Sequence, residues 1–100
     1  MAEKRRKAGG RYTEPDLPDR VIGRQGAVTI EHFYRSGDHG PPHLHVSGGG
    51  ASTRIGQNGR ILKGGSSLTA VQQQAVDEYR TAMRKALRKI GRWHWFDRLP

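Results

Sequence analysis

Apolar and polar residues alternate with a period of two over the middle of the chain. Residues 27–35 are rich in β-branched and aromatic side chains and predict a long strand. A short strand is predicted before it at residues 20–23, with a turn at Gln25-Gly26. Further strands are predicted at residues 43–47, 51–57 and 60–63. Asn58-Gly59 is the pair favoured in two-residue type I′ hairpins, so we expect a curled antiparallel sheet of four or five strands.

The spacing of apolar residues changes to three or four beyond this region. It predicts an amphipathic helix over roughly residues 69–90. Thr69 and Gln72 have the spacing of a capping box at its start, and Gly91 is expected to end it. The expected apolar stripe consists of Val71, Ala75, Tyr79, Ala82 or Met83, Ala86 or Leu87, and Ile90. Strands followed by one helix predict an α+β fold, in which a small curled antiparallel sheet carries one long amphipathic helix.

The chain of 100 residues is long enough for one small domain. Residues 1–19 show neither the strand period of two nor the helical spacing of three or four. They combine a basic cluster with glycine and proline, which predicts a flexible basic arm or linker. Residues 20–98 are expected to form a single compact domain. The sequence has no cysteine, which excludes disulfides and thiolate chemistry. No signal peptide or membrane span is predicted, so we expect the domain to act in the cytoplasm.

Charge adds a candidate partner to this picture. Eighteen Lys and Arg against nine Asp and Glu give a net charge of +9. Arg80, Arg84 and Arg88 recur every four residues along one ridge of the predicted helix, with Arg92 beside them. Such a stripe can track phosphates, so nucleic acid is the expected partner, with RNA favoured. The alternative is a solvated helix face that keeps a small protein soluble.

Both tryptophans lie in the segment 93–96 at the end of the predicted domain. One interpretation is that these aromatic side chains pack as a lid on a small core. The other is that one ring, with Trp93 as the candidate, stacks on a nucleobase beside the arginines.

Residues 38–46 place three of the five histidines beside an acid and two prolines. If this segment ends in a strand, the period of two sends Leu44 and Val46 to one face and His43 and His45 to the other. The strand would then have an apolar side and a reactive side.

Pro41 and Pro42 restrict their own backbone and that of Gly40, so they form a stiff connection before the strand. His39 is therefore expected at the rim of the same cleft as the other two histidines. Asp38 is expected to orient one of the rings. The candidate site is Asp38, His39, His43 and His45.

Three interpretations of these histidines remain open. In the first, two imidazoles act as base and acid in cleavage of an RNA backbone, without a cofactor. Arg54 or Lys63 would hold the phosphate. In the second, His39, His43 and His45, with Asp38, bind a divalent metal ion such as zinc, iron or nickel. In the third, the rings bond loop carbonyls and only hold the proline turn in shape.

The signature Asp38-His39-x-Pro41-Pro42-His43-x-His45 extends into Gly48-Gly49, residues 54–59 and Leu62-Lys63-Gly64. With this continuation it resembles a small bacterial domain-of-unknown-function family with a D-H-x-P-P-H-x-H signature, over roughly residues 20–96. Members occur as short standalone proteins in settings like toxin–antitoxin loci. With residues 55–59 and 90–93, the chain looks most like the C-terminal tips of Rhs-repeat polymorphic toxins.

The resemblance implies a toxin-like setting. It suggests delivery as the tip of a larger secreted protein and an immunity protein or antitoxin as partner, and it leaves the reaction to the residues. We expect a bacterial toxin effector domain that acts on nucleic acid, as a histidine-dependent ribonuclease or a metal-dependent nuclease. The alternative is a non-enzymatic nucleic-acid-binding module of a toxin–antitoxin-like system.

Overall fold

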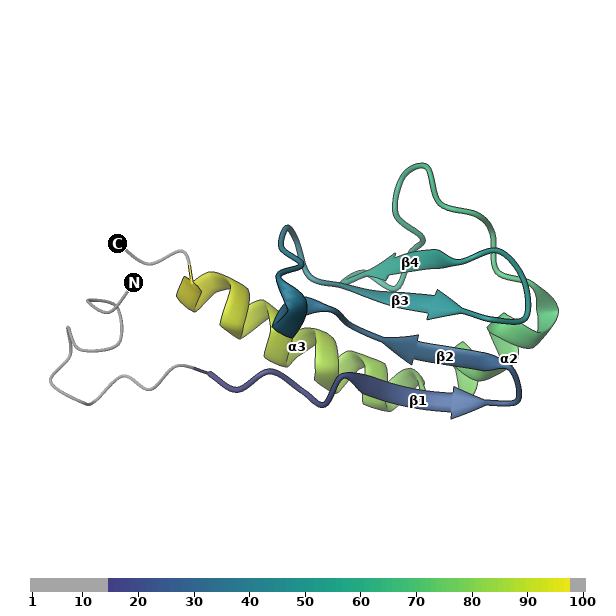
Figure 1. The fold of residues 1–100 in the computed structure, drawn as a ribbon, viewed down its shortest axis with the longest axis horizontal. Helices are drawn as coiled ribbons and strands as arrows, with labels where there is room; N and C mark the ends of the chain where they lie inside the picture. Colours follow the sequence, from purple (N-terminus) through teal and green to yellow (C-terminus); the bar gives the residue numbers. More distant parts are fainter. Residues whose placement is uncertain (1–14, 98–100) are drawn as a thin grey trace, which may run out of the picture.

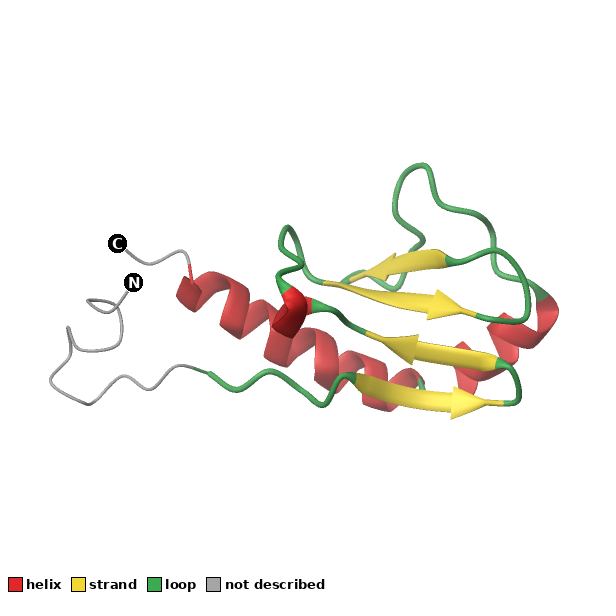
Figure 2. Ribbon diagram, viewed as in Figure 1, coloured by secondary structure: helices red, strands yellow, loops and turns green. Residues whose placement is uncertain are grey.

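A four-stranded antiparallel sheet with the strand order β1-β2-β3-β4 forms the centre of the molecule (Figure 1). The structure, a computed structural model, describes residues 15–97. The strands are β1 (Val21–Gln25), β2 (Val28–Glu31), β3 (His43–Ser47) and β4 (Thr53–Gly56), and a 3-10 turn, η1 (Tyr34–Ser36), follows β2. The helices α2 (Ala70–Glu78) and α3 (Arg80–Asp97) follow the strands, so the α+β fold is confirmed (Figure 2).

The core lies between the sheet and α3. Leu44 of β3 is fully buried and pairs with Ile55 of β4, while the helix contributes Leu87 and Ile90 at helical spacing. Each such buried aliphatic side chain contributes about 1.5–3 kcal/mol to the free energy of unfolding. The core therefore covers one face of the sheet and leaves the histidine face of β3 on the other side.

The long strand predicted over residues 27–35 is wrong at its end, because β2 stops at Glu31. The buried His32 explains this. One ring nitrogen lies 2.9 Å from the carbonyl oxygen of Pro18, and the other accepts the backbone N–H of Tyr34 at 3.2 Å. These two bonds of the His32 ring take the chain out of the strand ladder and into η1.

The predicted type I′ hairpin at Asn58-Gly59 is also wrong. Such a turn needs positive φ at both residues, and no residue other than glycine has positive φ in the part of the chain that the structure describes. Instead, Gly56 donates its N–H to Arg60 and Gly59 has a φ of 79°, which gives a three-residue loop. The expected strand 60–63 is reduced to one bridge between Ile55 and Ile61, so the sheet has four strands.

The expected helix over residues 69–90 is interrupted once and runs further. Its capping box between Thr69 and Gln72 is confirmed. Tyr79 separates α2 from α3, because its hydroxyl donates to the carbonyl oxygen of Arg24 at 2.7 Å and ties the chain to β1. Gly91 does not end the helix, which continues to Asp97. Within the expected apolar stripe, Val71 is instead half exposed.

The first described residues contact the fold, although the sequence assigns them to the arm. Leu17 packs against the core, and Arg35 donates to the carbonyl oxygens of Leu17 and Pro18 at 2.9 and 3.0 Å. The rest of the predicted arm, residues 1–14, and Arg98 at the predicted domain end lie outside the described residues. None of the described helices combines the length and apolar character needed to cross a membrane.

Candidate functional site

The loop between η1 and β3 delivers an acid to the histidine face of the sheet. Gly37 and Gly40 have φ values of 100° and 97°, which turn the chain on either side of Asp38. Pro41 and Pro42 then lead directly into β3. As expected, the alternation along β3 places His43 and His45 together on the face opposite the aliphatic core residues, with ring centroids 5.0 Å apart.

Both rings point at the same carboxylate oxygen. The Nε2 atom of His43 lies 2.9 Å from Oδ2 of Asp38, and Nε2 of His45 lies 3.3 Å from it. One ligand atom from each of the three residues falls within 4.8 Å of the others. Two imidazoles and one carboxylate on a common point are a recognised ligand set for divalent transition metals.

The other nitrogen of His43 is held by backbone oxygen. Its Nδ1 atom lies 2.8 Å from the carbonyl oxygen of Pro41 and 2.9 Å from the hydroxyl of Tyr34. A carbonyl oxygen can only accept, so the tautomer with its proton on Nδ1 donates to Pro41 and turns a bare Nε2 toward Asp38, the arrangement in which a metal ion would lie between them. In the other tautomer, Nδ1 accepts the Tyr34 hydroxyl proton and Nε2–H donates to the Asp38 carboxylate.

Burial and charge shift the pKa values of two groups around this ring. Burial raises the pKa of Tyr34 to about 12, and the negative charge of Asp38 is the second cause of this increase. For Asp38, partial burial raises the pKa, but hydrogen bonds from His45 and His43 and the nearby His43 charge outweigh it and hold the pKa below its usual value. The carboxylate is thus charged and the phenol neutral at physiological pH.

The remaining residues expected at the site are dispersed around this cluster. His39 donates its backbone N–H to Oδ1 of Asp38, while the side chain is exposed and does not belong to the metal-competent group. The carboxylate of Asp38 lies against the two rings, where it was expected, whereas the His39 ring is not part of the ligand group. Arg54 pairs with His45 across β3 and β4, so its exposed side chain lies on the same face. Lys63 is exposed in the loop beyond the bridge.

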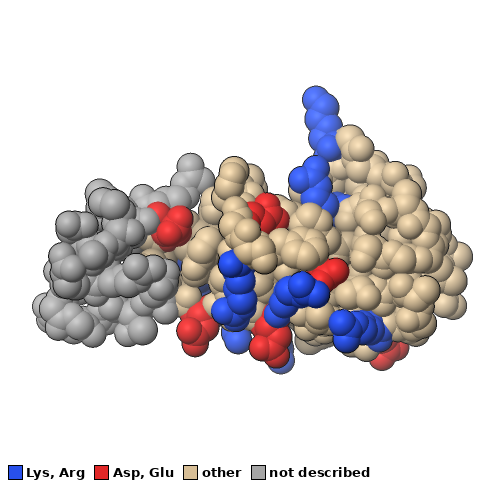
Figure 3. Space-filling model, in the orientation of Figure 1, with Lys and Arg blue, Asp and Glu red and all other residues tan. Residues whose placement is uncertain are grey.

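The expected arginine stripe is exposed on α3 at Arg80, Arg84, Arg88 and Arg92. Arg80 forms an ion pair with Asp77, which offsets part of its charge. The basic face is not one patch, since Lys85 and Lys89 line a separate hollow next to residues 16–19. On the face seen in Figure 3, basic and acidic side chains alternate along the lower edge.

Trp93 is a core residue rather than a free stacking ring. It is partly buried, packs against the core and meets the ring of Tyr34 edge to face at 5.7 Å. Trp95, two residues later, is 65% exposed. The lid interpretation therefore describes Trp93, and the exposed ring is Trp95.

Two aromatic residues of the site were not expected from the sequence. Tyr34 holds His43 as described, and Phe33 meets the ring of His45 edge to face at 4.7 Å. Both belong to a run that reads as a strand. One sequence feature could have indicated them, namely two consecutive aromatic residues shortly before Gly37. Where a chain leaves a sheet, both rings of such a pair can turn toward the next strand.

Comparison with known proteins places this cluster in a family. Neither a search of the curated proteins nor one of the solved structures gave a match. A family model does match over residues 30–94, a span that includes the whole cluster from Tyr34 to His45 and most of α3. The chain belongs to the family described as Domain of unknown function (DUF4160).

Proposed function

We propose that the domain is a bacterial toxin-like effector that acts on nucleic acid, with RNA as the favoured substrate. The net charge of +9 and the exposed arginines of α3 support a polyanionic partner. The resemblance to the tips of Rhs-repeat toxins supports delivery as part of a larger protein. In that setting the domain acts in the cytoplasm of the target cell and is countered by an immunity protein or antitoxin.

The proposed reaction is metal-dependent cleavage of a phosphodiester at Asp38, His43 and His45. One observation carries this choice, namely that Pro41 occupies Nδ1 of His43 and leaves Nε2 aimed at the same point as the other two ligand atoms. A backbone carbonyl behind a ligating histidine is a common arrangement at metal sites, because it selects the tautomer and orients the ring. A divalent ion would supply charge stabilisation for the phosphate and an activated water.

Metal-free catalysis by two histidines is less well supported by the geometry. It requires a base and an acid that both contact the substrate. His43 is only 4% exposed and is enclosed by Tyr34, Pro41 and Asp38, so it cannot reach a phosphodiester. The side chains of His45 and Asp38 are 27% and 26% exposed, so a metal ion held between them would remain accessible.

Cleavage of a labelled RNA with added metal ions tests the proposal. Purified protein is stripped with chelator and resupplied with Zn²⁺, Mn²⁺, Ni²⁺ or Fe²⁺. We expect no cleavage in chelator, restored cleavage with one of these ions, and loss of at least about 10-fold in His45→Ala, because mutation of a residue that only supports a metal ligand already costs about 10–100-fold in affinity or activity. His39→Ala, the neighbouring histidine outside the cluster, should retain activity.

Two outcomes would replace this reaction by another. Full cleavage in chelator that still depends on His45 would establish metal-free acid/base chemistry. RNA binding without cleavage under any metal condition, together with a folded His45→Ala variant that binds equally well, would identify a non-enzymatic binding module.

A further inference from the structure

Three adjoining hollows lie in a row along α3, on the side of the 57–59 loop. Their volumes are about 150, 240 and 400 Å³. Gln57 lines all three, Arg84 and Leu87 are shared by the first two, and Arg88 is shared by the last two. Because neighbouring hollows share lining residues, they lie side by side along the helix, and we call the row the α3 groove.

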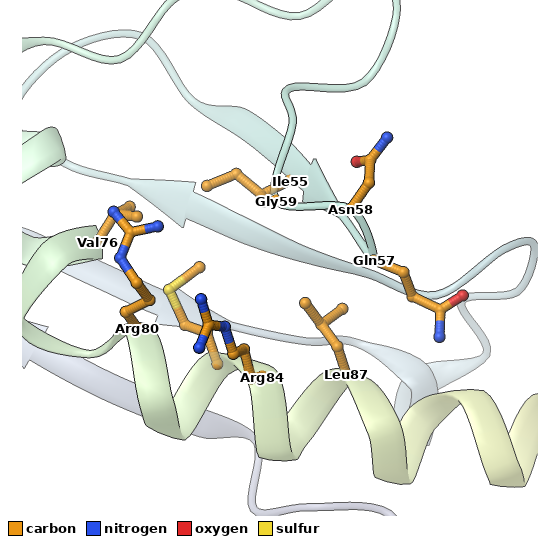
Figure 4. A pocket seen from close by; sticks show the side chains of 9 residues that line it. Ile55, Gln57, Asn58, Gly59, Val76, Arg80, Arg84 and Leu87 are labelled. Carbon is orange, nitrogen blue, oxygen red and sulfur yellow. The ribbon is translucent and has the colours of Figure 1, made fainter.

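The α3 groove has a cationic wall and an apolar floor. Figure 4 shows Arg80, Arg84 and Leu87 projecting from α3 on the side that faces β4, and all three line the first hollow. Ile55, Val76 and Met83 complete that floor. None of the described residues that line the three hollows is acidic. The groove is therefore suited to an anion that also has apolar surface.

The arginines of the groove repeat at a regular distance. They recur every four residues, which is about 6 Å along a helix axis. This is of the order of the separation between successive phosphates in an extended single strand. Among them, Arg84 and Arg88 carry no ion pair within the described residues, whereas Arg80 is paired with Asp77. The strongest phosphate positions are therefore Arg84, Arg88 and, further along, Arg92.

An aromatic ring lies at the end of this row of charges. The third hollow is lined by Arg92, Trp95 and Pro42, and the Trp95 ring is largely exposed. Exposed tryptophan costs hydration free energy, whereas base–aromatic stacking is a main source of affinity in single-strand binders. Pro42, which lines this hollow, directly precedes His43 in the chain.

We propose that the α3 groove binds a short segment of single-stranded nucleic acid, with its phosphates on Arg84, Arg88 and Arg92 and one base stacked on Trp95. This inference rests on the proposed function for its polyanionic partner and specifies which form of it is bound. A duplex keeps its bases stacked on one another and cannot offer one to Trp95, so single strands should be preferred.

Fluorescence anisotropy with short labelled oligonucleotides tests the groove. The probes are single-stranded RNA, single-stranded DNA of the same sequence, and the RNA duplex, all in chelator so that no metal-dependent cleavage occurs. The double variant Arg84→Gln/Arg88→Gln is compared with Lys85→Gln/Lys89→Gln, which removes the same charge from neighbouring positions of the same helix that line a different hollow. Near-ultraviolet and far-ultraviolet circular dichroism confirms that each variant is folded.

We expect the arginine pair to lower the slope of log K against log salt by about 1.4, since each phosphate contact on a single strand contributes about 0.7. The lysine pair should change the slope by less than half of that. Trp95→Ala should weaken binding about 5- to 150-fold at constant salt slope, because stacking contributes about 1–3 kcal/mol per base. Equal affinity for the RNA and DNA strands would mean that the groove recognises the phosphates and the base face. Higher affinity for RNA would mean that it also contacts the 2′-hydroxyl.

Equal effects of the two double variants, or duplex binding as tight as single-strand binding, would overturn the groove. The experiments distinguish failure of the groove proposal from failure of the proposed function. Metal-dependent RNA cleavage that is unaffected by substitution of Arg84, Arg88 and Trp95 would support the proposed reaction and contradict nucleic-acid binding in the α3 groove. Binding that depends on these three residues, without any cleavage, would support the groove proposal and contradict the proposed reaction.

Discussion

The Nδ1 atom of His43 lies 2.8 Å from the carbonyl oxygen of Pro41, two residues earlier in the chain. The ring is thus held by the segment that delivers it to β3. Its other nitrogen lies 2.9 Å from Asp38. With its proton on Nδ1, the ring donates to Pro41 and would offer Nε2 to a metal ion shared with Asp38.

Divalent metal ions should raise the thermal midpoint of the wild-type protein. Binding to the folded state alone adds about 2.7 kcal/mol to the free energy of unfolding at a ligand concentration of 100 Kd. Asp38→Asn and His45→Ala should lose most of this shift, since the first removes the carboxylate charge and the second removes a ring nitrogen on the accessible side. Differential scanning fluorimetry with and without Zn²⁺ or Ni²⁺ measures it.

His39→Ala is the matched control for this shift, because its side chain is exposed and outside the ligand set. Its metal-dependent shift should equal that of the wild type. An unchanged shift in Asp38→Asn and His45→Ala would place any bound metal elsewhere.

The period of two along β3 was sufficient to predict that His43 and His45 share a face, because side-chain alternation is local geometry. That the Asp38 side chain joins the cluster while the His39 side chain does not could not be predicted in this way. They are neighbours in sequence, and positive φ at Gly37 and Gly40 decides which side chain turns toward the sheet. Such backbone conformations depend on how the loop closes, which no local pattern encodes.

The aromatic residues show the same limit. Tyr34 lies in a run with strand composition, and only the bonds of the buried His32 ring turn it toward His43. Trp93 and Trp95 are equivalent by composition, and the helix that continues past Gly91 places one in the core and the other in solvent. The sheet and the helix follow from periodicity, whereas these assignments depend on contacts between distant segments.

Tyr34 should make the stability of the metal-free protein sensitive to high pH. Its folded pKa of about 12 exceeds the usual value of 10.0, so the unfolded chain loses the phenolic proton first. The stabilising effect of the neutral phenol is therefore complete below pH 10 and is lost as the pH rises toward 12. Urea unfolding between pH 9 and 12 should show a steeper decline for the wild type than for Tyr34→Phe.

The quantity to compare is the difference in free energy of unfolding between the wild type and Tyr34→Phe at each pH. Lysines and the other tyrosines titrate in both proteins, so their contributions cancel in this difference. Tyr34→Phe should also be less stable at neutral pH, by about 1 kcal/mol, since the hydrogen bond to Pro41 at 2.9 Å is lost. Parallel pH curves would contradict the buried, neutral phenol.

Gly91→Ala should stabilise the protein by up to about 1 kcal/mol. Glycine in the middle of a helix is unfavourable, and residue 91 lies inside α3 without positive φ. A methyl group there would meet only the terminal amide of Gln57 at 2.9 Å, which is exposed and can rotate away. Urea denaturation measures the change, and clear destabilisation would show that the helix ends near residue 91.

Gly23→Ala is the contrasting substitution in β1. The added methyl group would lie 2.4 Å from the ring of Tyr79, which cannot retreat because its hydroxyl is bonded to Arg24. Overpacking of this kind typically costs about 1–3 kcal/mol. An unchanged free energy of unfolding would mean that Tyr79, between α2 and α3, can move to accommodate the methyl group.

Gln72 should contribute more to stability than any exposed glutamine of α2. It is fully buried, its Oε1 accepts the backbone N–H of Thr69, and its Nε2 donates to the carbonyl oxygens of Gly48 and Ala51, each at 3.0 Å. Gln72→Leu keeps the volume but removes all three bonds, which should cost about 2–4 kcal/mol in urea unfolding. Gln74→Leu, an exposed position on the same helix, should change stability by less than about 0.5 kcal/mol. Equal effects at both positions would mean that the loop at residues 48–51 is held to α2 by packing alone.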